Sequence, residues 1–226
     1  MYKTWIQPDQ SVHLARAIRR CSDICMSKCG LTSEHILKLS RVLETSSIRK
    51  LDLSFNAFDC SGVNELLSVL SRAKNSALRT LELEATFDFL DDDENWNCAI
   101  FDTFCKSQQN LEILNLSSNF LDDDFICDNK KALKRLKNLR ALQIAHNFIT
   151  DYGVYKLSRF ENKVTHVDLN ENPINSIKNI LTNKGYQQPG RKSALQRFIP
   201  LLLGFALAEA TGLFGLVVAL IILFAF

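Results

Sequence analysis

One acidic side chain stands alone in the most apolar part of the chain. Residues 198–226 read FIPLLLGFALAEATGLFGLVVALIILFAF, and Glu209 is their single ionisable residue. From Leu201 to Phe226 a helix would be ~39 Å long, which exceeds the ~30 Å hydrocarbon core of a bilayer. We therefore predict one transmembrane helix over 198–226. A carboxyl group at that depth costs at least ~2.5 kcal/mol to insert, so Glu209 is expected to face protein or water and to mark an ion path.

A second set of polar residues follows an internal repeat. Four segments share the pattern LxxLxLxxN, and two others are poorer copies. The four good copies are IRKLDLSFN at 48–56, LEILNLSSN at 111–119, LRALQIAHN at 139–147 and VTHVDLNEN at 164–172; the poorer ones are CSDICMSKC at 21–29 and LRTLELEAT at 78–86. The closing positions lie 25 to 33 residues apart, which leaves room for a helix in each repeat. After Asn56, four apolar residues from Val63 to Leu70 recur at helical spacing.

This motif and its period resemble the long, ribonuclease-inhibitor-like class of leucine-rich repeats. The resemblance spans about residues 21–181 and implies an α/β solenoid with parallel strands inside and helices outside. The apolar positions of each repeat would stack inward, and the closing Asn amide would satisfy backbone groups that no strand ladder covers. Cys29 and Thr86 stand where other copies have Asn, so we expect a frayed first coil and a strained third coil.

Residues that alternate with the buried ones would line the concave sheet, the surface that solenoids commonly use for partners. Acids outnumber the single lysine there, and the acidic stretches 88–94 and 122–124 would lie near one rim. The residues predicted to bind a partner are Asp23, Lys50, Asp52, Glu82, Glu84, Asn115, Gln143, His166 and Asp168. Complementary fields favour a protein partner with a basic surface. The alternative is a solvated acidic rim that keeps the array soluble.

Composition and motifs exclude several other classes of function. A net charge of +2, with 23% charged residues, describes a globular chain and no strong polycation. Residues 130–140, KKALKRLKNLR, predict a basic helix face with Leu133 and Leu136 turned inward, but aromatic stacking platforms for nucleic acid are absent. Seven cysteines without paired spacing indicate reduced thiols. Without a Ser/His/Asp arrangement, a phosphate loop or a calcium loop, we expect no enzyme activity, no metal site, no cofactor and no nucleic-acid binding.

The run GFALAEATGLF at 204–214, with LFAF at 223–226, resembles the second helix of the ATP synthase c subunit in its mitochondrial form. The resemblance implies that Glu209 is the proton-binding residue, whose carboxyl group takes up and releases a proton as the ring turns. It covers about 30 residues. The family's glycine-rich first helix has no counterpart, and PGRKSALQRFIP at 189–200 replaces its ArgAsnPro-type loop. Ring formation by this chain alone is therefore not expected.

The basic residues next to the apolar segment predict its orientation. Arg191, Lys192 and Arg197 precede the span and no charge follows it, which favours a repeat domain on the cytoplasmic or matrix side. We expect a single-pass protein of the mitochondrial inner membrane, with the repeats in the matrix. The predicted organisation is an N-terminal cap at 1–20, repeats at 21–181, a linker at 182–197 and the membrane helix at 198–226. Arginines near residue 20 leave open that the cap is a targeting segment.

Three functions remain open from the sequence. The first is a membrane-anchored interaction subunit that binds protein, including subunits of the ATP synthase membrane (Fo) sector, and contacts membrane lipid. The second is proton transport, in which Glu209 cycles protons as a ring member. The third is a scaffold in another membrane with no proton role.

Overall fold

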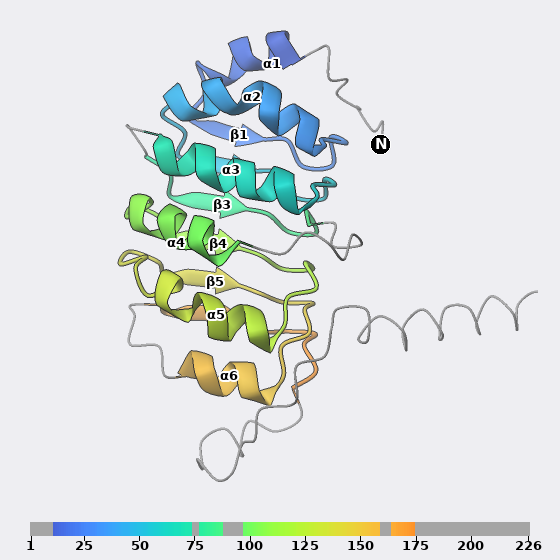
Figure 1. Cartoon of the computed structure of the whole chain (residues 1–226), viewed down its shortest axis with the longest axis vertical. Coiled ribbons are helices and arrows are strands. Elements are labelled where there is room, and N and C mark those ends of the chain that lie inside the picture. The colour runs from blue at the N-terminus through green and yellow to red at the C-terminus, as the bar shows by residue number, and fades with distance from the viewer. Residues whose placement is uncertain (1–10, 74–76, 88–96, 159–163, 175–226) are drawn as a thin grey trace, which may run out of the picture. The chain divides into compact units, whose positions relative to one another are not determined.

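The computed structural model describes residues 11–73, 77–87, 97–158 and 164–174, which form a stack of strand–helix coils (Figure 1). The strands are β1 (Asp23–Cys25), β2 (Lys50–Asp52), β3 (Thr80–Glu82), β4 (Ile113–Asn115), β5 (Ala141–Gln143) and β6 (His166–Asp168). The helices are α1 (Ser11–Ile18), α2 (Ser33–Thr45), α3 (Cys60–Arg72), α4 (Cys98–Ser107), α5 (Asp123–Leu133) and α6 (Asp151–Ser158). The strands form one parallel sheet in chain order, and each of the six predicted motifs supplies one strand. The predicted α/β solenoid with parallel strands is confirmed.

The predicted membrane helix at 198–226 lies outside the described residues. Within those residues, no helix is both long and apolar enough to cross a bilayer. The chain divides into two compact units, Met1–Gln187 and Gln188–Phe226.

The apolar positions of the motif build a continuous core between the sheet and the helices. The register joins Leu51 to Leu81, Leu114 and Leu142 across four strands, and each of these side chains is at most 2% exposed. From the helix side, α3 buries the residues that the sequence placed at helical spacing, including Val63 and Leu70. At the N-terminal end, α1 packs along α2 and buries Ile18. One repeat cannot bury its own apolar face, so stacking is what creates the core.

The closing Asn residues connect each coil to the one before it. Asn147 is 4% exposed, and its Oδ1 accepts hydrogen bonds from the amides of Asn119 (3.0 Å) and Leu121 (2.9 Å). Its Nδ2 donates to the carbonyls of Leu116 (3.1 Å) and Ile144 (3.0 Å). The side chain thus satisfies backbone groups between the strands and the following turns, as the motif predicts.

Two coils have another residue in place of the closing Asn. The first coil is not frayed, because β1 pairs with β2 and Asn56 of the second coil donates to the Met26 carbonyl and accepts from the Leu31 amide. Thr86 of the third coil is fully buried, and its hydroxyl lies within hydrogen-bond distance of two carbonyl acceptors, those of Glu84 (3.0 Å) and Leu53 (3.3 Å). The Thr86 hydroxyl therefore replaces the donor group of the Asn side chain but not its acceptor. In the first coil, the side chain of Asn56 from the second coil makes the bonds to the backbone.

The residue before each closing position adopts a left-handed backbone conformation, with φ between 46° and 59°. These residues are Lys28, Phe55, Ala85, Ser118, His146 and Glu171. None is glycine, so each carries a backbone cost that the bonds of the following side chain must offset. The same sharp bend in every coil ends the strand and redirects the chain toward the helix.

A second ladder of side chains joins the helix N-termini. Asp59 caps α3, and its Oδ1 accepts from the Gly62 amide (2.7 Å) and from the Ser33 hydroxyl of the preceding coil (2.7 Å). Gly62 is required there, because a Cβ atom at this position would lie 2.1 Å from Ser33 Oγ. Further along the stack, Gly153 occupies the equivalent place beside Asp123, at 2.3 Å from Asp123 Oδ1 to an added Cβ. These glycines allow neighbouring helices to begin side by side.

Candidate partner-binding surfaces

The face of the sheet opposite the helices, which we call the strand face, carries all nine residues predicted to bind a partner. The register arranges them in rows that cross the strands. One row runs from Asp23 and Lys50 to His166, and the next contains Cys25, Asp52, Glu82, Asn115, Gln143 and Asp168. Neighbouring side chains in such a row lie ~5 Å apart, the spacing between strands. The structure therefore brings the predicted residues onto one surface.

Three carboxylates gather where β2 and β3 meet. Asp52 is the register partner of Glu82, and Glu84 follows on the same side of the chain as Glu82. Among the described residues, no lysine or arginine lies within ion-pair distance of these three carboxylates. We call Asp52, Glu82 and Glu84 the acidic group. A surface with neighbouring acids that lack a counter-ion attracts a cationic partner.

Two members of the acidic group, Asp52 and Glu84, are held in place by hydrogen bonds. The Ser54 amide donates to Asp52 Oδ1 (3.0 Å), and the Cys25 thiol donates to Asp52 Oδ2 (3.3 Å). Asn115 Nδ2 donates to Glu84 Oε2 at 3.4 Å. Burial, with smaller contributions from Cys25 and Asp52, raises the pKa of the nearby Cys29 thiol, which favours its protonated form. Polar contacts that fix the carboxylates in advance reduce the ordering cost of binding.

The other predicted residues differ in accessibility. Asp23, Lys50 and His166 are exposed, whereas Gln143 and Asp168 are half-buried. Asn115 is only 7% exposed, and its Oδ1 accepts from the Ser117 amide at 3.0 Å. Asn115 therefore supports the neighbouring loop and Glu84, and offers little surface to a partner.

The acidic rim predicted near the third and fourth coils is only partly described. Residues 88–96 lie outside the described residues. Asp122 caps α5 by accepting from the Phe125 amide (2.9 Å). Asp123 is 9% exposed and accepts from the Thr150 amide (2.9 Å), the Thr150 hydroxyl (2.5 Å) and the Gly153 amide (3.0 Å). Placing Asp123 on a solvated rim was wrong, because the next coil covers this side chain.

The basic segment 130–140 is positioned differently from the predicted helix face. Leu133 and Leu136 are buried as expected, but α5 ends at Leu133, so the second half of the segment is a turn that leads to β5. The sequence predicts the positive charge of this segment but not the turn that arranges it. The three-residue spacing of the cations and of the leucines was the available signal. The predicted proton-binding residue Glu209 lies outside the described residues.

Two known families match separate parts of the chain. The family described as Leucine Rich repeat matches residues 135–158, which contain β5 and α6. The family of the ATP synthase C subunit matches residues 185–222, which include Glu209. This second match already begins inside the predicted linker 182–197, so the similarity to the c subunit reaches further toward the repeats than the sequence motif indicated.

Similar proteins divide the chain in the same way. The ATP synthase c subunit of Pelagibacter ubique is 86% identical over 35 residues, which are 15% of this chain and 47% of that protein. The protein "NACHT, LRR and PYD domains-containing protein 9B" of Mus musculus is 25% identical over 191 residues, 70% of this chain and 18% of that protein. The chain thus spans about half of the first relative and less than a fifth of the second.

Two solved structures are also similar to the chain, at a low level. An internalin (InlF) from Listeria monocytogenes matches with a TM-score of 0.39 and 14% identity, over 70% of this chain and 44% of that one. The ectodomain of the receptor kinase SOBIR1 from Arabidopsis thaliana matches with a TM-score of 0.33 and 18% identity, over 76% of this chain and 98% of that one. These values are too low to carry an argument about function. The chain carries leucine-rich repeats followed by a C-terminal segment that is similar to the c subunit of ATP synthase.

Proposed function

We propose that this protein is a membrane-anchored interaction subunit that acts by binding protein and has no enzyme activity. Its repeats would attach a partner with a basic surface to the membrane (Fo) sector of ATP synthase, on the matrix side of the mitochondrial inner membrane. The observation that carries this proposal is the presence, on one chain, of a polar strand face and a segment with 86% identity to an ATP synthase c subunit. A segment so similar to that protein is suited to the same neighbours in the membrane.

The acidic group supports the choice of a basic partner. Asp52 and Glu82 lie on neighbouring strands, and Glu84 follows β3. None of the three is neutralised by a described lysine or arginine. Charge complementarity mainly raises the association rate and selects the partner, and both effects weaken as salt screens the charges.

The test is purification of the full chain from a mild detergent, with identification of the proteins that accompany it. Recovery of Fo subunits supports the proposal. Recovery of other membrane proteins without ATP synthase would instead favour the scaffold in another membrane. The contribution of the strand face is tested with the double variant Glu82→Gln/Glu84→Gln, which should lose the partner. The control Glu34→Gln/Glu65→Gln removes the same charge from helices α2 and α3 and should retain it.

A second candidate function is proton transport by Glu209. It is favoured by the match of residues 185–222 to the C-subunit family, which includes this carboxyl group. A protonated carboxyl group in an apolar site reacts with a hydrophobic carbodiimide, so a transporting Glu209 should be labelled and Glu209→Gln should stop proton flux in membranes that hold the chain. An interaction subunit would keep its partners in Glu209→Gln, and flux would be unchanged.

A further inference from the structure

A row of cations runs along the turn between α5 and β5. Three of the backbone hydrogen bonds there join residues three apart, from Arg135 to Ala132 (2.9 Å), from Leu136 to Leu133 (3.1 Å) and from Leu139 to Leu136 (3.2 Å). Bonds between residues three apart bring side chains at that spacing toward the same side of the chain. Leu133, Leu136 and Leu139, which are three residues apart, are all fully buried. Four cations recur with the same three-residue spacing, and all are exposed: Lys131, Lys134, Lys137 and Arg140. We call these four residues the basic row.

The members of the basic row have no counter-ion in the part of the chain that is described. Each ion pair nearby uses another cation: Arg135 and Lys106 both pair with Asp102, and Arg79 pairs with Glu112. Lysines in the last turn of a helix are explained by the helix dipole, which would account for Lys131 at the end of α5. Lys137 and Arg140 lie beyond that turn, so helix capping does not explain them.

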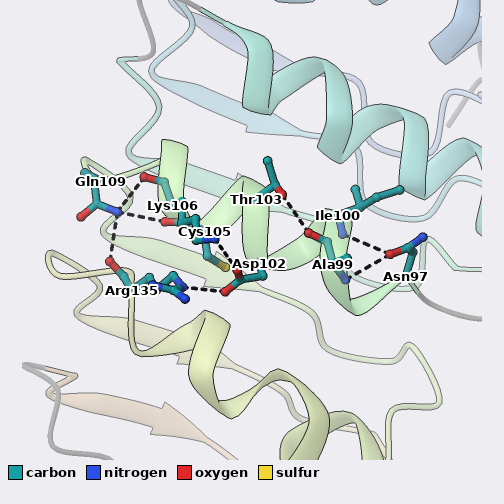
Figure 2. A network of polar contacts seen from close by, with 9 residues as sticks. All are labelled: Asn97, Ala99, Ile100, Asp102, Thr103, Cys105, Lys106, Gln109 and Arg135. Atoms are coloured by element: carbon teal, nitrogen blue, oxygen red, sulfur yellow. Dashed lines mark hydrogen bonds and ion pairs between the residues drawn. The ribbon is translucent and has the colours of Figure 1, made fainter.

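The turn that displays the basic row is fixed to α4 (Figure 2). Arg135 Nε donates to Asp102 Oδ1 (2.6 Å), and Gln109 Nε2 donates to the Arg135 carbonyl (3.0 Å). Asn138 Nδ2 donates to the Gln109 carbonyl at 2.7 Å. Hydrogen bonds from Lys106 and Arg135 lower the pKa of Asp102, so its carboxylate stays charged and keeps Arg135 turned away from the row. The cations are thus presented on a rigid support.

We infer that the basic row binds an anionic lipid surface. This inference rests on the proposed anchoring of the chain by its C-terminal apolar segment, which would keep a bilayer within reach of the repeats. Exposed lysines and arginines near an anionic leaflet are attracted without needing a shaped pocket. Residues 130–140 contain no aromatic side chain on which bases could stack, so nucleic acid is disfavoured as the occupant.

The connection is long enough for this contact. The basic row lies at the edge of the array where helices end and strands begin, and the described chain leaves β6 at the opposite edge (Figure 1). α3, with 13 residues, is ~20 Å long, which approximates the distance between the two edges. The stretch from residue 174 to the start of the apolar run at 198 can span up to ~80 Å when extended. Anchoring therefore permits the basic row to reach the surface.

The experiment compares the full chain in vesicles of phosphatidylcholine with the full chain in vesicles that also contain phosphatidylglycerol. Amine acetylation is followed residue by residue with mass spectrometry at Lys131, Lys134 and Lys137. In the anionic vesicles these lysines should react at least ~5-fold more slowly, and added salt should remove the protection. Lys50 on the strand face is the internal control, and its rate should be the same in both vesicles.

A second measurement follows amide exchange of the turn. Protection of residues 134–140 by anionic vesicles should be lost when Lys131, Lys134 and Lys137 are replaced by Gln. The matched control replaces Lys28, Lys38 and Lys50 instead and should keep the protection. Equal acetylation of the basic row in both vesicles, or protection by added nucleic acid and not by vesicles, overturns the inference. If alkaline carbonate extracts the chain from the vesicles, the proposed anchoring is refuted. The binding of the basic row to lipid is still tested in that case, because protection of its lysines by added anionic vesicles can be measured on the extracted chain.

Discussion

Replacement of Asn147 by alanine tests the energetic role of the Asn ladder. The variant leaves three buried groups without their hydrogen-bond partner: the amides of Asn119 and Leu121, and the carbonyl of Leu116. The Ile144 carbonyl retains a bond from Asn172 Nδ2 at 2.8 Å. An unsatisfied buried donor costs ~1–3 kcal/mol, so the two amides alone predict a loss of roughly 2–6 kcal/mol. Asn172→Ala should cost less than half of this, because that side chain is half-buried and water can replace it.

The assay is amide exchange of the full chain in a mild detergent. In Asn147→Ala the amides of Asn119 and Leu121 should exchange at least ~30-fold faster, since each tenfold change corresponds to ~1.4 kcal/mol. Asn138→Ala, which removes an exposed side chain, is the control and should leave these amides unchanged. The reasoning is refuted if Asn147→Ala changes their exchange by less than ~5-fold, or if Asn172→Ala has the same effect as Asn147→Ala.

Two further predictions concern the ladder at the helix N-termini. Gly62→Ala should destabilise the repeats by ~1–3 kcal/mol, as measured by urea unfolding. Adding Ser33→Ala should not restore the stability, because the Cβ atom of residue 33 would still lie 2.6 Å from the new methyl group. Full recovery in the double variant would contradict the steric explanation. Burial alone would raise the pKa of Asp59, but hydrogen bonds from Gly62, Ser33 and Ser61 outweigh burial and lower it. The stability that the ionised Asp59 carboxylate contributes is therefore present above the unfolded-state pKa of ~4 and is lost as the pH falls through the lower folded-state pKa. The stability difference between wild type and Asp59→Asn, measured by thermal unfolding, should therefore shrink below pH ~4, and a difference that grows there would disprove the assignment.

The repeated motif was sufficient to predict the sheet. The LxL part of the motif predicts the alternating burial at Leu51, Leu81 and Leu114. A strand that pairs only with the equivalent strands of adjacent coils takes its register from the repeat. For the same reason the motif alone assigned the strand face residue by residue. The family matches confirm the repeats and the similarity of the C-terminal segment to the ATP synthase c subunit, whereas the Fo sector and the mitochondrial membrane stay proposals.

Contacts between coils could not be predicted from the motif. Asp123 belongs to an acidic cluster in the sequence, but in the fold its carboxylate is buried. It accepts hydrogen bonds from the amides of Thr150 and Gly153, which lie 27 and 30 residues later in the chain. Asn115 appears in the sequence as one more strand-face residue, and only its neighbours Glu84 and Ser117 make it a supporting side chain.

By itself, the sequence determined the period, the buried positions and the presence of one isolated carboxyl group in an apolar run, because all three depend on residue type and spacing along the chain. Only the tertiary structure decided which acids on β2 and β3 lack a described counter-ion and which cations turn outward after α5. Whether two charges pair depends on the distances between coils, and the cations point outward because the leucines between them are buried in the core.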